Sequence, residues 1–483
     1  MNEFSQYRTI YRGTLKQISD MSIGGTEAIS PVDMPLAKDG QGRYVIKGTT
    51  LAGALVYTLN KLNVRFPKEV AFDDEYHRHH DEPRELGPSA WKVSNSYLSS
   101  DHQNVKTQLR QYVKIDAASG AAEDGALFSM EVISRGVDWD FLMEVNTRIE
   151  PSRLISQQDE TVPTPDELAQ LALRHWLREG VFLGRRSVAG NGWFELSAVE
   201  KLTLTTEHID CWPNNELTPQ ASFDRLKKMK SVQVCQLEPA ENAHSNRIEI
   251  EFTLTAGPYR DDDGKEWGLD GFLIAGHAAE QPLDIDNSYL KKHIGFPEHY
   301  SYNVHHDEPD RFFVQDQNGQ PFIPGSTLRG ILHHEISRIL ISEDATLAQS
   351  KELQPKIEQL FGSTDVSSRL FVGDATLDKT EAAKTADWQG LILHNHAENE
   401  FTAGVYGSNK FVRMSIVNGT FRGKIILEAA NSQTLQEQHD LLLQAIEKGK
   451  KRQLPVGGKQ WVDSGWLEWD IEPAQDSAEE KAS

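Results

Sequence analysis

Two short stretches of this sequence carry the residue types that bind phosphate groups. Each has a glycine followed by two hydroxyl residues, and each stands between an apolar strand-like segment and an apolar helix-like segment. The residues are Gly48, Thr49 and Thr50 in the first stretch and Gly325, Ser326 and Thr327 in the second. The first backbone N–H groups of a helix have no partner within it, so they attract anions, and a glycine lets a phosphate approach closely. We therefore expect an anion site at each stretch.

An ordinary capped helix is the alternative interpretation of the same residues. Thr49 or Thr50 can cap a helix that runs from Leu51 to about Leu62, because Ser and Thr are favoured at helix N-caps. The GxxxxGK[ST] pattern of a P-loop is absent. The two stretches alone therefore do not indicate a nucleotide-hydrolysing enzyme.

A second glycine-rich element, GRRSVAGNGW, begins at Gly184. It can bring Arg185 and Arg186 to phosphates and leave Trp193 near bases. In the second half of the chain the positive charge comes from Lys459 and from an upstream basic run, Lys448, Lys450, Lys451 and Arg452. The alternatives are a hairpin turn that packs a tryptophan into the core, which we favour for Trp193 and Trp466, and a solvated basic helix end.

These elements belong to an internal duplication. Residues 33–53 align with residues 310–330 without a gap, at an offset of 277 residues. The spacing of eight between Gly184 and Gly192 recurs between Gly457 and Gly465, and Gly-Trp-x-Glu follows in both places. The segments between these blocks also match in order. We interpret the chain as two copies of one domain.

The elements that must position the phosphate-binding stretches follow from hydrophobic periodicity and from cap signals. Each half has the order strand, helix, two strands, helix, strand, which indicates an α+β, ferredoxin-like domain. The first half is expected to have strands at 6–18, 112–115, 126–133 and 139–145 and helices at 51–62 and 165–180. The second half is expected to have strands at 247–255, 369–377, 391–395, 410–417 and 421–428 and helices at 327–341 and 434–447.

The duplication sets the expected domain boundaries. We place the first domain at residues 1–205 and the second at residues 247–470. A linker with a short basic helix, residues 206–246, joins them. Residues 258–303 have no counterpart in the first half and are expected to be an insertion in the second domain. The acidic tail, residues 471–483, is expected to be disordered.

Composition limits the classes of function. Lys plus Arg number 50 and Asp plus Glu number 72, so the net charge is −22. This charge argues against loose, charge-driven nucleic-acid binding, and any RNA contact is expected to be confined to a local groove. No apolar run approaches a membrane span and no signal peptide is evident, so a cytoplasmic protein without membrane contact is expected. The two cysteines, Cys211 and Cys235, are too few for a disulfide framework.

Several of these segments resemble the RAMP superfamily. The most specific are PFIPGSTLRGIL and FGSTDVSSRLFVGDATL in the second half, and VDMPLAKDGQG followed by KGTTLAGAL is a looser match in which Lys47 replaces the usual proline. More narrowly, they resemble backbone subunits of type III CRISPR interference complexes. Two fused units resemble the double-unit subunits of type III-D assemblies. The resemblance implies two tandem ferredoxin-like (RRM-like) RAMP domains with inserted β-hairpin thumbs.

The resemblance also implies an activity and partners. Such subunits line up along CRISPR RNA beside other type III subunits. In the target-cutting members, an Asp on the loop before the Pro-Gly-Ser-type helix is needed for metal-dependent cleavage of the target RNA. The matching residues are Asp33 and Asp310, with Asp307 as an alternate for the second. They imply a site for Mg²⁺ or Mn²⁺ at Asp33 and at Asp310, and attack by the RNA 2′-OH. The expected RNA-binding residues are Gly48, Thr49, Thr50, Arg185, Arg186, Gly325, Ser326, Thr327, Arg329 and Lys459.

Two other functions remain open on the sequence. One is a structural CRISPR RNA binder that does not cleave. The other is a stand-alone endoribonuclease that processes CRISPR RNA precursors, which needs a histidine as general base. His77, His79 and His80 are more typical of a solvated loop than of a metal site. His333 and His334 have Val56 and Tyr57 as their counterparts, which argues against a shared catalytic role.

Overall fold

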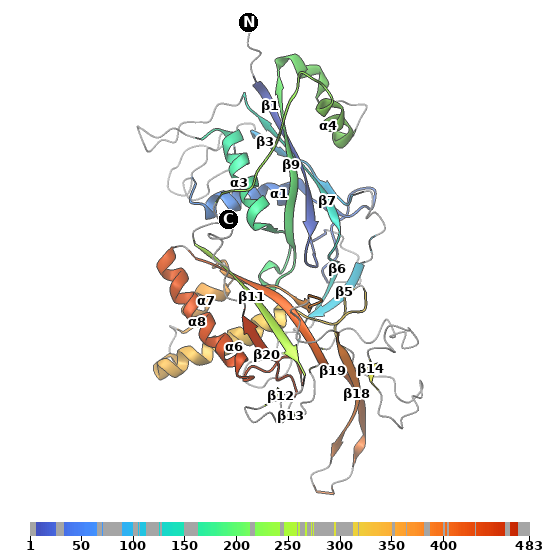
Figure 1. Cartoon of the computed structure of the whole chain (residues 1–483), viewed down its shortest axis with the longest axis vertical. Helices are drawn as coiled ribbons and strands as arrows, with labels where there is room; N and C mark the ends of the chain where they lie inside the picture. The colour runs from blue at the N-terminus through green and yellow to red at the C-terminus, as the bar shows by residue number, and fades with distance from the viewer. Residues whose placement is uncertain are drawn as a thin grey trace, which may run out of the picture. The chain divides into compact units, whose positions relative to one another are not determined.

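The structure is a computed structural model of the chain. It describes residues 6–25, 33–64, 70, 89–99, 105, 107–112, 125, 128–148, 163–212, 218–241, 246–257, 259–260, 266–267, 272, 274, 294–295, 313–316, 318–349, 353–363, 365–380, 387–398, 401–402, 405–429, 431–458 and 464–471. The chain forms two compact units (Figure 1). Unit 1 consists of Met1–Thr107, Glu131–Ser187 and Asn191–Ser245, and unit 2 consists of Gln108–Met130, Val188–Gly190 and Asn246–Ser483.

Unit 1 is built on an antiparallel sheet with the strand order β10-β9-β1-β7-β3. Its strands are β1 (Gln6–Gln17), β3 (Trp91–Val93), β7 (Asp138–Asn146), β8 (Val181–Phe182), β9 (Trp193–Thr205) and β10 (Gln233–Gln236), and a short separate pair is β2 (Val45–Ile46) with β4 (Ser96–Tyr97). The first and third core strands, β1 and β7, lie side by side between the second, β3, and the fourth, β9. This order, with a helix after β1 and after β7, confirms the predicted ferredoxin-like α+β fold.

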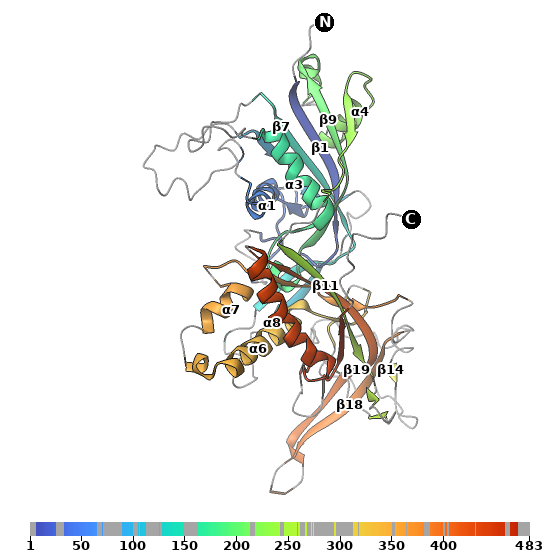
Figure 2. The ribbon, with the colours of Figure 1, turned by 60° about the vertical axis from the view of Figure 1, so that its left-hand side comes forward.

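Two helices cover one face of this sheet (Figure 2). They are α1 (Gly48–Lys61) and α3 (Pro165–Glu179). The start of α3 is fixed by a capping box between Thr164 and Glu167, as its sequence predicts. The two helices are joined by a hydrogen bond of 2.8 Å from Trp176 Nε1 to Thr58 Oγ1. Their apolar stripes complete a buried core with the inner sides of β1, β7 and β9.

The described residues 206–212 and 218–241 of the expected linker, 206–246, form secondary structure within unit 1. They contain η3 (Thr206–Cys211), α4 (Pro219–Lys227) and β10. Phe223 and Leu226 of α4 pack with Leu202 of β9 in a second buried cluster. The interpretation as a linker missed this packing because only the two or three apolar positions of α4 face the sheet, whereas its other side is basic.

Unit 2 repeats the sheet with the order β14-β18-β19-β11-β20, and β16 joins β19 as well. Its strands are β11 (Arg247–Ala256), β14 (Ile294–Gly295), β15 (Phe322–Ile323), β16 (Leu370–Val372), β17 (Ala375–Leu377), β18 (Gln389–Glu398), β19 (Val405–Glu428) and β20 (Glu468–Ile471), and β12 (Tyr259–Arg260) pairs with β13 (Glu266–Trp267). The central pair β11–β19 corresponds to β1–β7 of unit 1.

Two strand predictions in unit 2 differ from the structure. The predicted strands 410–417 and 421–428 are one continuous strand, β19, because Gly419 stays in line with its neighbours and Asn418 still pairs with β18. The predicted strand 369–377 is divided into β16 and β17 at Gly373 and Asp374. This break turns out to hold the start of a helix, as described below.

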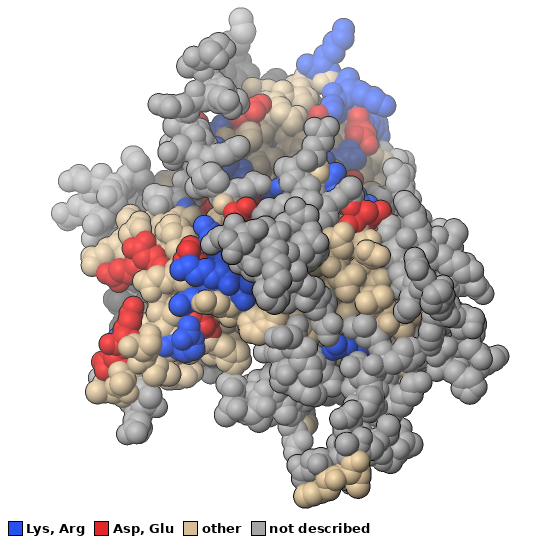
Figure 3. Space-filling view, turned by 60° about the horizontal axis from the view of Figure 1, so that its bottom comes forward, with Lys and Arg blue, Asp and Glu red and all other residues tan. Residues whose placement is uncertain are grey.

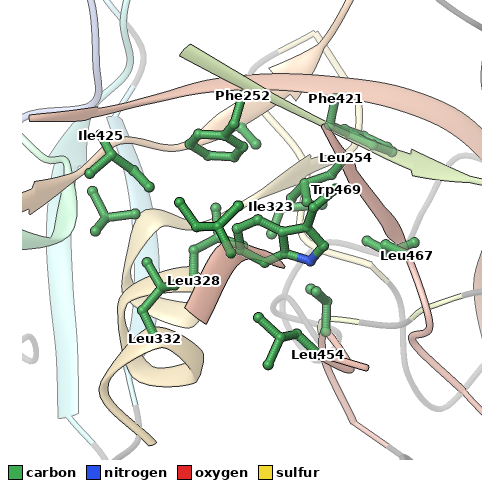
Figure 4. Close-up of a cluster of buried hydrophobic side chains, with 14 of the residues drawn as sticks. Phe252, Leu254, Ile323, Leu328, Leu332, Phe421, Ile425, Leu454, Leu467 and Trp469 are labelled. Carbon is green, nitrogen blue, oxygen red and sulfur yellow. The ribbon is translucent and has the colours of Figure 1, made fainter. Parts of the chain in front are cut away.

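The helices of unit 2 are α6 (Gly325–Glu343), η4 (Ala345–Gln349), α7 (Leu353–Phe361) and α8 (Ser432–Lys450). Figure 4 shows the centre of the core beneath them, where Leu328 and Leu332 of α6 lie close to Trp469 of β20. The Trp469 ring stacks on Phe252 of β11 with centroids 5.7 Å apart. No helix in the described parts of the chain is long and apolar enough to cross a bilayer.

The tight turn within the repeated stretch has the same structure in both units. The Asp39 carboxylate accepts the N–H groups of Gln41 and Arg43, at 2.9 and 3.0 Å. The Asp316 carboxylate accepts those of Asn318 and Gln320, at 2.8 and 3.0 Å. An Asx turn of this kind fixes the hairpin without a ligand. This part of the repeated stretch therefore acts as scaffolding in both units.

Unit 2 also contains segments of the N-terminal half, which the predicted boundary at residue 205 did not anticipate. One belongs to the antiparallel pair of β5 (Thr107–Tyr112) and β6 (Phe128–Ile133). The Arg110 guanidinium lies 4.6 Å from the centroid of the Phe322 ring in β15. The other segment is Val188–Gly190, next to η2 (Ser187–Ala189). These contacts depend on tertiary packing, so sequence periodicity gives no sign of them.

Candidate nucleic-acid interface

The start of α1 is closed by a side chain from another part of the sheet. Lys47 is the N-cap, and its side chain makes no capping bond. The Gly48 N–H donates instead to Asn95 Oδ1 at 2.9 Å. A Cβ on Gly48 would lie 2.1 Å from the Val93 carbonyl oxygen. Glycine is therefore required here because the β3–β4 turn packs against it, and the space that it provides is not left open for a phosphate.

The start of α6 has the same construction. The Gly325 N–H donates to Asp374 Oδ1 at 2.8 Å. A Cβ on Gly325 would lie 2.1 Å from the Val372 carbonyl oxygen. The N-cap is Pro324, again without a side-chain capping bond. In both units the helix begins at the glycine, so the predicted cap at Thr49 or Thr50 is wrong.

Asn95 and Asp374 are the residues that sequence reasoning missed. They occupy equivalent positions, two residues after Val93 and Val372, at the end of the second core strand. The signal was present in the printed sequence, because WKVSNSYL (91–98) aligns with LFVGDATL (370–377) without a gap. Residues 91–98 follow a polar stretch and have only a weak strand pattern, so their correspondence to residues 370–377 is hard to recognise from the sequence.

The exposed surface of the α1 start consists of hydroxyls and one lysine. Thr49 is exposed and Thr50 is half-buried, whereas Ser326 and Thr327 in unit 2 are both half-buried. Lys47 is exposed and forms no hydrogen bond or ion pair with any residue that the structure describes. A cation at the positive end of a helix dipole is unfavourable for the helix by itself. Lys47 is therefore suited to bind an anion at the start of α1.

The two arginines of the glycine-rich element differ in their surroundings. Arg185 is exposed, its N–H donates to the Ser22 carbonyl at 2.8 Å, and its guanidinium lies against Gly24. No described residue forms a hydrogen bond or ion pair with that guanidinium. Arg186 is half-buried, has a left-handed φ of 57°, and its side-chain Nε is buried. Arg185 is therefore the better placed of the two to reach a ligand.

Arg329 is engaged inside unit 2. Its guanidinium donates to the Leu370 carbonyl at 2.6 Å, to the Ser368 hydroxyl at 3.2 Å and to the Phe361 carbonyl, and it lies over the Phe361 ring. It also donates to the Val188 carbonyl at 3.5 Å. This set of bonds gives Arg329 a structural role that the predicted RNA contact did not include.

Asp33 lies on the segment that leads into the repeated hairpin, and its side chain is exposed. The segment is held on two sides, by a hydrogen bond of 3.1 Å from the Glu131 N–H to the Met34 carbonyl and by one of 3.0 Å from the Gly25 N–H to the Pro35 carbonyl. Gly25 follows Gly24, against which Arg185 packs. Asp33 and Arg185 therefore belong to paired neighbouring segments of unit 1.

The described residues do not form a complete set of protein ligands for a divalent ion. These ranges contain no group of three or more His, Cys, Asp or Glu that can hold a metal ion. Mg²⁺ often binds through one or two carboxylates and keeps several waters, with phosphate oxygens from a substrate completing its shell. The single exposed carboxylate of Asp33 fits an ion of that kind and does not fit a protein-only metal site.

Some predicted residues lie outside the described residues. They are Asp307, Asp310 and Lys459 among the expected site residues, and His77, His79 and His80 among the alternatives. Trp193 and Trp466 are described, and both are half-buried, whereas the residues that follow them, Phe194 and Leu467, are buried in the cores. The two tryptophans are therefore only partly buried, and the residue after each of them occupies the core position.

Charge on the visible surface is mixed. On the face in Figure 3, Lys and Arg lie in several small groups, with Asp and Glu close to them. The described part of that surface has no broad basic patch. This distribution agrees with the expectation that any RNA contact is local.

Comparison with known proteins identifies the family. The sequence profile of the RAMP superfamily matches residues 14–195 and 293–467. The chain belongs to the RAMP superfamily. The two matched regions coincide with the two copies of the ferredoxin-like domain. RAMP proteins are associated with RNA binding and work in CRISPR RNA-associated complexes of several subunits. A search of curated proteins gave no match.

Proposed function

We propose that this RAMP protein is a backbone subunit of a type III CRISPR interference complex, similar to the double-unit subunits of type III-D. In this role it binds CRISPR RNA through both domains and cleaves complementary target RNA at two regularly spaced sites. Its partners are CRISPR RNA, target RNA and other type III subunits.

The observation that carries the proposal is the composition of unit 2. In unit 2, β5 of the N-terminal half contacts β15 through Arg110 and Phe322, and the loop Val188–Gly190 lies against the start of α6. A Cβ on Gly190 would lie 2.6 Å from the Val372 carbonyl, and a Cβ on Gly325 would lie 2.7 Å from the Ala189 carbonyl. One domain copy thus supplies part of the helix start of the next copy. This is the arrangement that a row of backbone domains along one RNA requires.

The proposed RNA-binding surface of unit 1 follows from accessible donors. Lys47, Thr49 and Arg185 are exposed, and Thr50 is half-buried. Cationic and hydroxyl groups of this kind bind phosphate oxygens and carry no base specificity. In unit 2 the corresponding residues are Ser326 and Thr327, to which we add Lys459. The guide sequence, not the protein, would therefore select the target.

For cleavage we propose Asp33 and Asp310 as the acting carboxylates, each with a Mg²⁺ or Mn²⁺ ion that is shared with RNA. When bound, such an ion neutralises phosphate charge. In the proposed reaction the RNA 2′-oxygen bonds to the adjacent phosphorus and the 5′-oxygen leaves. This leaves a 2′,3′-cyclic phosphate on one product and a 5′-hydroxyl on the other. Holding one nucleotide in line for this attack supplies much of the acceleration.

A structural CRISPR RNA binder without cleavage is the second candidate. It is favoured because the described residues contain no group of three or more His, Cys, Asp or Glu that can hold a metal ion. A stand-alone processing nuclease is less favoured, because His333 is half-buried against Phe361 and the counterparts of His333 and His334 in α1 are Val56 and Tyr57.

The experiment is cleavage of a complementary RNA by the assembled complex, with products counted at nucleotide resolution. The proposal expects two cuts that require divalent metal. Asp33→Ala should remove one cut and Asp310→Ala the other, while guide binding persists. Unchanged cutting in both variants would reject the catalytic assignment. Cutting of precursor RNA by the isolated protein without metal would support the processing nuclease instead.

A further inference from the structure

Among the residues that the structure describes, strand β10 is the outermost strand at one edge of the unit 1 sheet. It pairs with β9 on one side, and all four of its residues, Gln-Val-Cys-Gln, are exposed. Val234 is a large apolar side chain that is 38% exposed. Edge strands are usually protected by charges, a proline or a bulge, since a free edge can pair with another chain. β10 has no charged residue and no proline, so it is competent to accept a strand.

The free side of β10 can be assigned from one hydrogen bond. The Leu237 N–H donates to the Val199 carbonyl at 2.8 Å, towards β9. Backbone groups alternate in direction along an antiparallel strand. The N–H and C=O groups of Gln233 and Cys235 therefore face β9, and those of Val234 and Gln236 face outward. Two residues thus offer outward donors and acceptors.

Charges on either side of β10 complement each other. Lys228 and Lys230 precede the strand, and Glu238 and Glu241 follow it. All four side chains are exposed, and none forms an ion pair with a residue that the structure describes. In an antiparallel arrangement the residues before one strand lie beside the residues after the other. When a second β10 pairs with this one, the two glutamates of each copy therefore lie beside the two lysines of the other copy.

We propose that β10 is a docking edge for a second copy of this chain, which pairs through its own β10 about a two-fold axis. The outward groups of Val234 in one copy bond to those of Gln236 in the other. The axis passes at Cys235, so the two Cys235 residues face each other as a non-hydrogen-bonded pair, with Cα atoms about 4.5 Å apart. The overall charge of −22 on each copy is screened over about 8 Å at physiological salt, so the local charges decide the register.

Cross-linking of the full chain tests the register. In a Cys211→Ser background, Cys235 is the single thiol, and facing cysteines at about 4.4–6.8 Å between Cα atoms can form a disulfide. Diamide takes up the two hydrogens of the two thiols as the S–S bond forms. We expect a covalent dimer. The matched control moves the thiol two residues, as Gln233→Cys with Cys235→Ser, onto the same face but away from its copy. We expect no cross-link from that control.

Sedimentation velocity over a concentration range measures the association without oxidation. Val234→Pro removes an outward N–H and leaves the bonds to β9 intact, so the dimer dissociation constant should rise by about tenfold or more. Circular dichroism and thermal unfolding check that the variant is folded. A wild-type chain that stays monomeric throughout overturns the proposal. Equal cross-linking from residues 233 and 235, or a dimer that Val234→Pro does not weaken, also overturns it, since another surface would then be the interface.

Charge reversal distinguishes a second copy from a foreign partner. Lys228→Glu with Lys230→Glu makes both sides of β10 acidic, and Glu238→Lys with Glu241→Lys makes both sides basic. Each variant alone should dimerise more weakly than wild type, and an equimolar mixture should recover a heterodimer. If the mixture does not recover, the complementary-charge pairing is rejected. If only a different protein occupies the edge in purified complexes, the second-copy proposal is rejected as well.

Discussion

The backbone N–H of Gly325 is bonded to the carboxylate of Asp374 at 2.8 Å, and in the other domain copy the same bond runs from Gly48 to the neutral amide of Asn95. One copy therefore has a negative charge built into the start of its helix, and the other does not. Because a carboxylate favours the positive end of a helix and repels phosphate, this difference makes the two helix starts unequal as RNA contacts.

Exchange of the two capping residues should reveal that inequality. Asp374→Asn keeps an acceptor for the Gly325 N–H and removes the charge, so CRISPR RNA should bind about two- to fivefold more tightly at low salt. Asn95→Asp should weaken binding by a similar factor. The measurement is RNA affinity against salt concentration. Equal affinities for wild type and both variants would show that RNA does not approach these helix starts.

Glycine substitutions should separate packing from flexibility. Gly48→Ala and Gly325→Ala each force a Cβ against a carbonyl oxygen 2.1 Å away, so the free energy of unfolding should fall by about 1–3 kcal/mol. The controls are Gly53→Ala and Gly330→Ala, in the same two helices, where nothing lies within 4 Å of the added Cβ. They should raise stability by about 0.5–1 kcal/mol each. Denaturant unfolding measures both. Equal changes in stability at Gly48 and Gly53, or at Gly325 and Gly330, would contradict the role of close packing at the helix starts.

Substitution of Arg329 and substitution of Arg185 should affect different properties, the first stability and the second RNA binding. Arg329→Ala removes the guanidinium that donates to the carbonyls of Leu370 and Phe361, so it should lower the thermal stability of unit 2. Arg185→Ala should leave stability unchanged and weaken RNA binding, with the slope of log affinity against log salt smaller by about one. Thermal unfolding and salt titration of RNA binding are the two readouts. Loss of stability in Arg185→Ala would contradict its assignment as an accessible contact.

His333 should contribute to the pH dependence of the free energy of unfolding. Burial, followed by the charges of His334 and Arg329, lowers the pKa of His333 below its usual value of about 6.5. The unfolded chain then binds more protons than the folded chain below that value, so His333 makes the free energy of unfolding fall as the pH drops through about 6.5 towards the folded pKa. His333→Val, the residue type at the counterpart position 56, should remove this part of the decline. The comparison is made by denaturant unfolding between pH 7.5 and 5.5. Parallel pH profiles for the two proteins would contradict this role for His333.

Removal of divalent metal should separate cleavage from binding. Because the described residues contain no group of three or more metal ligands, and Mg²⁺ often binds through one or two carboxylates together with substrate phosphates, chelation should stop target cleavage in the assembled complex without unfolding the protein or releasing CRISPR RNA. Product analysis and gel shift measure the two effects on the same sample. Release of the guide on chelation would point to a structural metal instead.

The sequence by itself determined the duplication, the ferredoxin-like fold and the family, because these depend on local periodicity, turn chemistry and repeated spacing. The turn at Asp39 and Asp316 and the capping box of α3 are local in the chain, so their residues can be recognised where they stand. Whether Asp33 and Asp310 cut RNA stays a prediction.

Tertiary structure alone decided what touches each helix start. Asn95 reaches Gly48 across 47 residues and Asp374 reaches Gly325 across 49, and no local pattern reports such a contact. The same holds for Arg329, whose carbonyl partners are assembled from three separate segments, and for α4, whose packing converted an expected linker into part of unit 1. Periodicity shows which side of an element is apolar, but only the folded chain shows which group lies opposite it.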